Sequence, residues 1–376
     1  MIENILTPCY VLEVEKLEKN LKLFEHIKSK IDIKILLALK GYALWDSFPL
    51  IAKYLDGITA SGLYEARLGA EEFKKEVHTY SPGFKEQDID EIVGYSNHIV
   101  FNSISQLKKF APKIESAKKN VSLGLRVNPE YSEVTPPIYN PCVINSRLGV
   151  IKSEFDESVL PLIEGLHFHT HCEQNSDALA RTLPHFEERF GIYLPSMKWV
   201  NFGGGHHITR ADYDVELFIR TIEEFQARYP HLQVYIEPGE AIGWECGFLV
   251  GEVLDIVKNG MEIAILDVSA ATHMPDTLEM PYRPLVRGSD EAGVEKHTYR
   301  LAGPTCLAGD VIGDYSFKQR LKVGDKIIFE DMIHYTMVKN NTFNGVPLPS
   351  IAKIDREGVF QIVKEFDYFD YKNRLS

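Results

Sequence analysis

The sequence predicts an α/β protein in which a (β/α)8 barrel of the TIM type is joined to a mainly antiparallel, β-barrel-like domain. Between residues 34 and 237 one pattern repeats: a short apolar or β-branched run ends in a small or polar residue, and a segment with helical apolar spacing follows. The run occurs eight times, which fits a closed barrel better than an open doubly wound sheet. After residue 244 hairpin-like β segments replace the helical spacing.

The eight runs are the expected barrel strands, and they end in residues that can do chemistry. In order they read "IKILLALK", "DGITAS", "EVHTYS", "HIVFNS", "VSLGLRVN", "IEGLHFHTH", "MKWVNFGGG" and "LQVYIEP". Helical spacing appears between them in "LYEARLGAEEF", "ISQLKKFAPKIESA" and "DVELFIRTIEEFQARY". The residues at the strand ends are Lys40, Ser61, Ser81, Asn102, Arg126, Asn128, His167 to His171, Gly203 to Gly205 and Glu237 to Glu240. Because the carboxyl ends of barrel strands build the active site, this ring predicts an enzyme.

Two domains are expected. Residues 15–241 would form the barrel, and residues 1–14 together with 242–376 the β domain. The β segments of the second domain are "FLVGEVLDIVKNG", "MEIAILDVSA", "HTYRLAGPTC", "DKIIFEDM" and "GVFQIVKEF", with "TPCYVLEV" from the N-terminus. The length of 376 residues is sufficient for two domains with sizeable cores.

Composition excludes several classes of function. The net charge of −13 argues against non-specific binding to nucleic acid, which depends on clustered Lys and Arg. The five cysteines are odd in number and show no CxxC spacing, so neither a disulfide framework nor a cysteine zinc site is indicated. The N-terminus lacks the features of a signal peptide and no apolar run reaches 18 residues, so we expect a cytoplasmic protein that binds no membrane.

Two strand ends suggest a bound cofactor. Lys40 closes the run "ILLALK"; desolvation at the floor of a barrel mouth suits a lysine to Schiff-base chemistry, whereas a solvated loop lysine would have no such role. Gly203, Gly204 and Gly205 follow the seventh strand, where backbone N–H groups can turn toward one phosphate. A purely structural turn needs only one glycine, so three consecutive glycines favour anion binding.

Histidines and a cysteine leave more than one interpretation open. His167, His169 and His171 alternate, so in an extended strand all three point to one face. They could form a metal cluster, stack on a planar cofactor or pack structurally. Cys306 lies between the turn signals of "LAGPTCLAGDVIGDY", with Asp310 four residues later; it could serve as a general acid or be inert.

In combination these motifs resemble the fold III pyridoxal-phosphate decarboxylases, the group of diaminopimelate, ornithine and arginine decarboxylases that shares its fold with alanine racemase. The matching landmarks run in order along nearly the whole chain. They are "TPCYVLEVEKLEKNL", "LALKG", "SGLYEA", "SRLGV", "GLHFHT", "NFGGGH", "EPGEA", "GPTCLAGD" and "DMIHYTMVKNNTFNG". Each landmark alone is only modest evidence for the family, but their occurrence together in this order is specific to it.

The resemblance implies a pyridoxal phosphate site. Lys40 would carry the cofactor covalently, and His169 would stack on its pyridine ring. Glu237 would contact the pyridine nitrogen and favour its cationic form through close opposite charge. Gly203 to Gly205 would receive the phosphate together with Tyr335. No metal ligand is assigned.

The same resemblance implies an active site shared by a homodimer. Cys306 matches the cysteine that protonates the product, and in the family it comes from the partner subunit together with Asp310, which would bind the substrate. Ser61 and Glu65 lie where the family has "SGGEL", although Leu63 replaces its second glycine.

Substrate recognition departs from the diaminopimelate decarboxylases. Those enzymes have a segment that resembles "EPGR", with an arginine where this chain has Glu240, so a cationic ligand is expected in place of a carboxylate. An ion pair of opposite charges at 4 Å contributes roughly 4 kcal/mol at an effective dielectric of about 20. Asp276 is a second candidate amine partner, with Glu279 behind it, although both could belong to a solvated acidic loop. Leu307 replaces the acid that commonly follows the family's cysteine, which weakens an assignment to ornithine decarboxylase. The segments "LDVSAATHMPDTLEMPYRP" and "EPGEAIGW" resemble the members that convert carboxynorspermidine or carboxyspermidine to norspermidine or spermidine.

Other functions remain possible at this point. Diaminopimelate or a basic amino acid could be the substrate on the same fold. From different classes come a regulator that holds pyridoxal phosphate without turnover and a metal-dependent hydrolase that uses His167 to His171. The complete second domain and Cys306 speak against the regulator, which needs neither.

Overall fold

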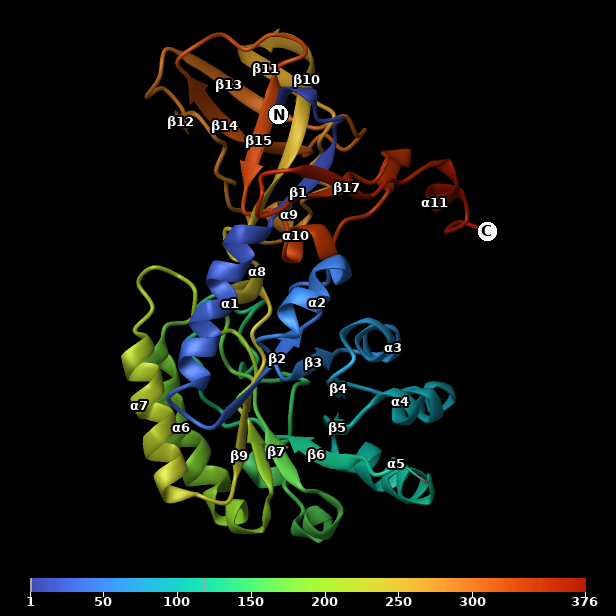
Figure 1. The fold of residues 1–376 in the computed structure, drawn as a ribbon, viewed down its shortest axis with the longest axis vertical. Coiled ribbons are helices and arrows are strands. Elements are labelled where there is room, and N and C mark those ends of the chain that lie inside the picture. Colours follow the sequence, from blue (N-terminus) through green and yellow to red (C-terminus); the bar gives the residue numbers. More distant parts are fainter. Residues whose placement is uncertain (1, 118) are drawn as a thin grey trace. The chain divides into compact units, whose positions relative to one another are not determined.

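The computed structural model describes residues 2–117 and 119–376 (Figure 1). The chain divides into two compact units: Met1–Lys19 with Gly243–Ser376, and Asn20–Ile242. The domain boundaries expected from the sequence lie after residues 14 and 241. Among the described residues, no helix is both long enough and apolar enough to cross a membrane.

The larger unit is a closed parallel barrel. Its strands are β2 (Ile33–Ala38), β3 (Gly57–Ala60), β4 (Glu76–Ser81), β5 (His98–Phe101), β6 (Ser122–Arg126), β7 (Gly165–His167), β8 (Trp199–Asn201) and β9 (Gln233–Ile236). Each pairs in parallel with the next, and β9 returns to pair with β2. All eight predicted strands are confirmed. They could be predicted because buried parallel strands appear in a sequence as short apolar runs.

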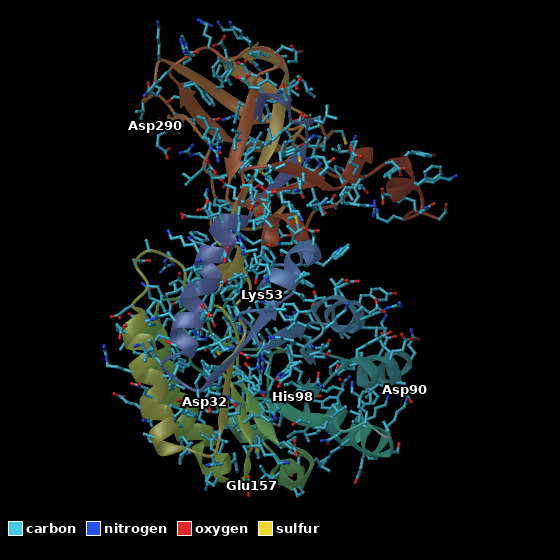
Figure 2. The ribbon with its side chains drawn as sticks, viewed as in Figure 1. Asp32, Lys53, Asp90, His98, Glu157 and Asp290 are labelled. Carbon is cyan, nitrogen blue, oxygen red and sulfur yellow. The ribbon has the colours of Figure 1, made fainter. Side chains whose placement is uncertain are left out.

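Helices alternate with these strands. They are α1 (Val14–Lys28), α2 (Phe48–Ile51), α3 (Leu63–Leu68), α4 (Ile89–Tyr95), α5 (Ile104–Ser116), α6 (Ser176–Phe190), α7 (Val215–Arg228) and α8 (Glu240–Gly243). Side-chain caps fix two of the predicted starts: Ser103 accepts from Gln106 N before α5, and Asp214 from Leu217 N before α7. Exposed acids such as Asp90 on α4 lie on the outer side (Figure 2).

The smaller unit is a mainly antiparallel sheet, as predicted. Its strands are β1 (Cys9–Glu13), β10 (Gly247–Asn259), β11 (Met261–Leu266), β12 (Ser289–Glu291), β13 (His297–Ala302), β14 (Val311–Phe317), β15 (Lys326–Glu330), β16 (Ser350–Ile354) and β17 (Phe360–Lys364). Its short helices are α9 (Asp276–Glu279), α10 (Tyr335–Val338) and α11 (Tyr368–Lys372). The N-terminal segment supplies β1, which pairs antiparallel with β10 and parallel with β16.

Trp199 fills much of the barrel interior. Its indole N–H donates to Ser122 Oγ at 2.9 Å, and its ring packs against the backbones of Gly124 and Gly165 on the neighbouring strands. A Cβ at either glycine would overlap the indole. The two glycines therefore make room for one large side chain.

We expect Gly165→Ala to lower the free energy of unfolding by about 1–3 kcal/mol, because the added methyl group overpacks a filled core. Gly94→Ala is the matched control, since a Cβ there would meet no atom within 4 Å, and it should be neutral or stabilise α4 by about 0.5–1 kcal/mol. Urea unfolding of both variants measures the difference. Equal stability of the two would contradict the packing role of Trp199.

Candidate active site

A buried carboxylate organises the carboxyl ends of β7, β8 and β9. Glu237 follows β9, and its Oε1 accepts a hydrogen bond from Asn201 Nδ2 at 2.8 Å. His167 Nε2 lies 3.4 Å from the other oxygen. Burial opposes ionisation of Glu237, but these two partners outweigh it and lower its pKa to about 2. Glu237 is thus a carboxylate inside the protein at neutral pH.

The compensation of this charge comes from neutral groups. Burial lowers the pKa of His167, so the imidazole is uncharged and can donate its Nε2–H. Among the described residues, no lysine or arginine forms an ion pair with Glu237. A buried anion without an adjacent cation can accommodate a cationic group, because an unpaired buried charge is unfavourable.

The glycine turn fits closely around His169. Gly204 N donates to His169 Nδ1 at 2.9 Å, and Gly203 N donates to Asn201 Oδ1 at 2.8 Å. Two of the three glycine amides thus have acceptors within the protein, and the binding of a phosphate by Gly203 to Gly205 stays a prediction. Gly203 and Gly205 have φ of +71° and +83°, and a Cβ at Gly204 would overlap the carbonyl oxygen of Glu237. The turn needs glycine for its backbone path and its close approach.

The three alternating histidines have separate partners, which removes the metal cluster from the interpretations left open by the sequence. β7 ends at His167, so strand alternation does not extend to His169 and His171. His167 contacts Glu237, His169 contacts Gly204, and His171 Nε2 lies 3.1 Å from Thr182 Oγ1. Burial lowers the pKa of His169 well below its usual range, so its ring is neutral and Nδ1 accepts. The metal hydrolase hypothesis loses its ligand set.

Barrel closure brings the turn of Lys40 next to that of Glu240. Ala38 N donates to Pro238 O at 2.9 Å, and a Cβ at Gly41 would lie 3.0 Å from the Cα of Gly239. Lys40 was expected to be desolvated, but its side chain is exposed, because β2 ends at Ala38 and the lysine lies in the following turn. Its amine lies close enough to the His169 ring that its charge, after burial, helps to lower the pKa of that imidazole.

Ser61 lies at the mouth of the next strand. It follows β3, and its amide donates to Glu65 Oε2 at 2.5 Å across the start of α3. Both predicted residues are thus held together by one hydrogen bond, and Leu63 opens the helix between them.

Three site residues were not assigned from the sequence. Asn201 bridges Gly203 and Glu237 through its amide group. Arg126 is buried, donates from Nη2 to His169 O at 3.1 Å, and lies with its guanidinium 4.8 Å from the centre of the Tyr80 ring. The available signal was position, since Asn201 and Arg126 end β8 and β6 and Tyr80 precedes the last residue of β4.

In the smaller unit, Asp276 is held with one oxygen uncommitted. Its Oδ2 accepts hydrogen bonds from Tyr282 OH at 3.0 Å and from Thr336 Oγ1 at 3.1 Å. Its Oδ1 is buried and has no hydrogen-bond partner among the described residues. Burial raises the pKa of Tyr282, so the phenol stays a donor. Glu279, by contrast, forms an ion pair with Lys339.

The loop of Cys306 is built around Asp310. Asp310 is buried and accepts from Ser269 Oγ at 2.8 Å, Thr305 Oγ1 at 2.7 Å and the amide of Ala271 at 3.2 Å. Both carboxylate oxygens are thereby used, which leaves the prediction that Asp310 binds substrate without support. Cys306 itself is exposed, and its amide donates to Asn344 Oδ1.

Tyr335 opens α10 and is partly buried. Its predicted contact with a phosphate stays a prediction.

The barrel mouth fits pyridoxal phosphate. It offers an exposed primary amine, a neutral imidazole locked by a glycine turn, and a buried carboxylate without a cation. These features are compatible with a barrel enzyme that binds a cationic ring cofactor.

Comparison with known proteins gives the family. Residues 9–333 match the family model described as "Pyridoxal-dependent decarboxylase, C-terminal sheet domain". The chain belongs to the pyridoxal-dependent decarboxylases.

Two curated relatives are similar over almost their full length. The carboxynorspermidine/carboxyspermidine decarboxylase of Campylobacter jejuni is 49% identical, with 99% of each chain covered. The carboxyaminopropylagmatine decarboxylase of a Synechocystis species is 47% identical, covering 100% of this chain and 97% of the relative. A crystal structure of the Campylobacter jejuni carboxynorspermidine decarboxylase complexed with norspermidine matches with a TM-score of 0.92 and 47% identity, covering 98% of this chain and 100% of that one.

The buried carboxylate predicts a pH dependence of stability. Because its pKa in the folded protein is lowered to about 2, Glu237 stabilises the fold fully above its ordinary value of 4.5 and progressively less as the pH falls from there toward 2. Glu237→Gln should therefore reduce the slope of unfolding free energy against pH between about pH 4.5 and 3 by up to about 1.4 kcal/mol per pH unit. Urea titrations at several pH values measure this slope. The same slope in wild type and variant would show that folding does not lower the pKa of Glu237.

Proposed function

We propose that the chain catalyses the pyridoxal-phosphate-dependent decarboxylation of carboxynorspermidine or carboxyspermidine, giving norspermidine or spermidine. The observation that carries the proposal is the acidic pair around the turn after β9. Glu237 is a buried anion without a cationic partner, and Glu240 opens α8 beside the turn of Lys40. The first acid suits the cofactor and the second a substrate amine. The similarity to the Campylobacter jejuni enzyme supports the same substrate class.

Each residue of the mouth then has a task. Pyridoxal phosphate, when bound, accepts the electron pair that the departing carboxyl group leaves behind. Glu237 holds a negative charge where the pyridine nitrogen must stay protonated. His169 presents a ring fixed by Gly204, which orients a planar group. Lys40 supplies the primary amine for attachment, and Ser61 and Gly205 lie at the same mouth.

Cys306 is proposed as the acid that delivers the proton to the carbon that has lost CO2. Its thiol is exposed, and the loop that carries it is shaped by the hydrogen bonds of Asp310. Asp310 is thus a positioning residue in this proposal. Tyr335 is proposed to contact the cofactor phosphate, as the resemblance implies.

Asp276 is proposed as a second residue that binds a substrate amine. Tyr282 and Thr336 hold its carboxylate in place, and Oδ1 still lacks a donor. A buried acceptor without a donor is unfavourable until a ligand fills it. Glu279 is less suited, because Lys339 already neutralises it.

Carboxyaminopropylagmatine is a second candidate substrate. The 47% identity to the Synechocystis enzyme supports this candidate. It differs from the triamines in carrying a guanidinium group, whose fork matches a carboxylate in two hydrogen bonds. Carboxynorspermidine and carboxyspermidine differ by one methylene, which is worth only about 1–3 kcal/mol in recognition. Rates of CO2 release from these three and from diaminopimelate, ornithine and arginine separate the possibilities.

Reversal of one charge should move substrate preference. We expect Glu240→Arg to lower kcat/KM for the carboxylated triamines by about tenfold to hundredfold, because a half-buried anion becomes a cation near a cationic substrate. The cofactor absorbance should persist. Glu224→Arg, the same change at an exposed position of α7, is the control and should leave turnover unchanged. Normal turnover in Glu240→Arg, or a wild-type preference for diaminopimelate, would contradict the substrate assignment.

The proton donor and the cofactor lysine can be tested together. Cys306→Ala should lower kcat by about 10²–10⁴-fold with the cofactor retained, and Lys40→Ala should prevent covalent fixation of the cofactor by borohydride. If the enzyme is a homodimer whose subunits share active sites, mixing the two inactive variants should restore about a quarter of wild-type activity. No recovery on mixing, with dimers seen by light scattering, would place Lys40 and Cys306 of one chain in one site.

A cytoplasmic location is also proposed, and cell fractionation tests it.

A further inference from the structure

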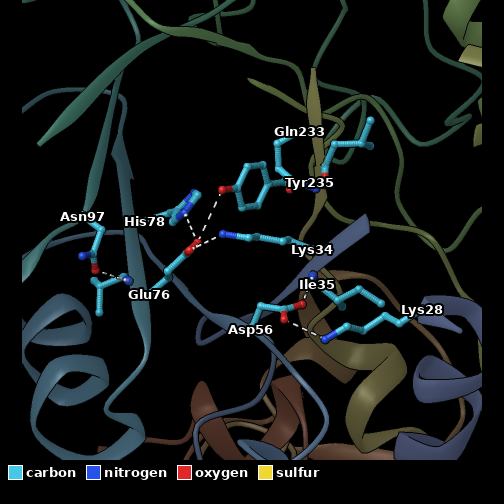
Figure 3. A network of polar contacts seen from close by, with 11 residues as sticks. Lys28, Lys34, Ile35, Asp56, Glu76, His78, Asn97, Gln233 and Tyr235 are labelled. Atoms are coloured by element: carbon cyan, nitrogen blue, oxygen red, sulfur yellow. Dashed lines mark hydrogen bonds and ion pairs between the residues drawn. The ribbon is translucent and has the colours of Figure 1, made fainter. Parts of the chain in front are cut away.

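A second group of chemically competent side chains lies at the opposite, amino-terminal ends of the barrel strands. Glu76 and His78 are two residues apart on β4, so they share a face of the strand. His98 opens β5 and is the direct register partner of His78. Figure 3 shows Glu76 and His78 turned toward each other from β4, and Figure 2 marks His98 within the barrel.

The donor atoms of this Glu76 group converge. Each of the three residues offers one ligand atom, and these atoms lie within 4.8 Å of one another. His78 Nε2 is 3.3 Å from Glu76 Oε2, and the two imidazole rings stack with centres 3.8 Å apart. The Nδ1 atoms of His78 and His98 are buried and have no hydrogen-bond partner among the described residues. Buried polar atoms in that condition require an explanation.

Protonation states at neutral pH suit a metal ion. Burial lowers the pKa of both histidines, that of His98 to about 2, so both rings are neutral. Burial opposes ionisation of Glu76, but hydrogen bonds from His78 and Lys34 lower its pKa to about 2. Two neutral imidazoles and one carboxylate therefore need no deprotonation before they bind a cation.

The group is also accessible. An open pocket of about 420 Å³ is lined by Glu76 and His98, with Asn97, Trp199 and Tyr235. An ion can reach Glu76 and His98 from this pocket, with His78 buried behind them, and water can complete its coordination. Among the described residues, this is the one group of His, Cys, Asp and Glu with metal-ligand spacing.

We propose that Glu76, His78 and His98 form a zinc site at the amino-terminal end of the barrel. Two histidines and a glutamate with an open fourth position are a ligand set typical of Zn²⁺. The ion would link β4 to β5 and satisfy the buried imidazole nitrogens. The proposed decarboxylase reaction does not use these residues, so the site is independent of it.

Two features must change when the ion binds. Donors of a tetrahedral zinc ion lie about 3.3 Å apart, so one of the stacked rings must turn about its Cβ–Cγ bond, a rotation with broad minima. Lys34 forms an ion pair with Glu76 and is the resident cation. Its side chain is 34% exposed, so the ammonium can withdraw toward solvent. Lys34 is therefore a competitor of the metal.

Because Lys34 competes with the metal, variants of the ligands and of Lys34 should change the zinc affinity in opposite directions. Holoenzyme carrying Cys306→Ser, so that the exposed thiol cannot bind metal, is dialysed against EDTA and titrated with Zn²⁺ alone by calorimetry. About one zinc per chain should bind and survive desalting, as metal analysis measures. His98→Gln and Glu76→Gln should weaken binding by at least about tenfold, whereas Lys34→Met should strengthen it about tenfold by removing a like charge.

His26→Gln, at an exposed histidine of α1, is the matched control and should not change the affinity. Circular dichroism and cofactor absorbance establish that each variant is folded. The gain in Lys34→Met cannot arise from misfolding, so it tests the site even if the ligand variants are unstable. Equal affinity in wild type and folded His98→Gln would overturn the proposal, as would no zinc binding by either wild type or Lys34→Met.

Discussion

Pairing of β9 with β2 is the constraint on which the rest of the barrel depends. It joins segments about 200 residues apart and closes the ring, so that the carboxyl ends of all its strands face one mouth. Its local consequence is the contact between the turns after the two strands. Gly41 and Gly239 allow these backbones to approach, and the approach brings Lys40 and Glu240 to the same side of the mouth. The spacing of the turns that carry Lys40 and Glu240 thus follows from closure of the barrel backbone.

The sequence was sufficient for the barrel but not for the directions of its polar groups. Eight buried runs predict eight strands, whatever their exact lengths. The direction of a side chain depends on where the strand ends, and β7 stops at His167, which separates the three histidines. Hydrogen bonding is also invisible in sequence: Asn201 and His169 take two of the glycine amides that were expected to bind phosphate.

The pairing register of strands that are distant in sequence determines the other features that the sequence did not predict. In the smaller unit, β1 lies parallel to β16 and β11 parallel to β13, pairings between distant segments that no local pattern specifies. In the barrel, His78 meets His98 only because their strands pair in that register. A shift by one residue would turn His98 to the other face of the sheet. The "EVHTYS" and "HIVFNS" runs therefore predict strands without predicting the Glu76 group.

The carboxylates of Glu76 and Glu237 differ in how their charge is balanced. Glu76 has its own cation in Lys34, whereas Glu237 has only the neutral donors Asn201 and His167. His78 lies in the electric field of both carboxylates and is kept neutral by burial. A folded chain can retain an unneutralised buried carboxylate only if other contacts support it, because desolvation of the charge costs several kcal/mol. At Glu237 we propose that a cationic pyridine ring balances this charge, so that the feature that is unfavourable to the fold would favour binding of the cofactor.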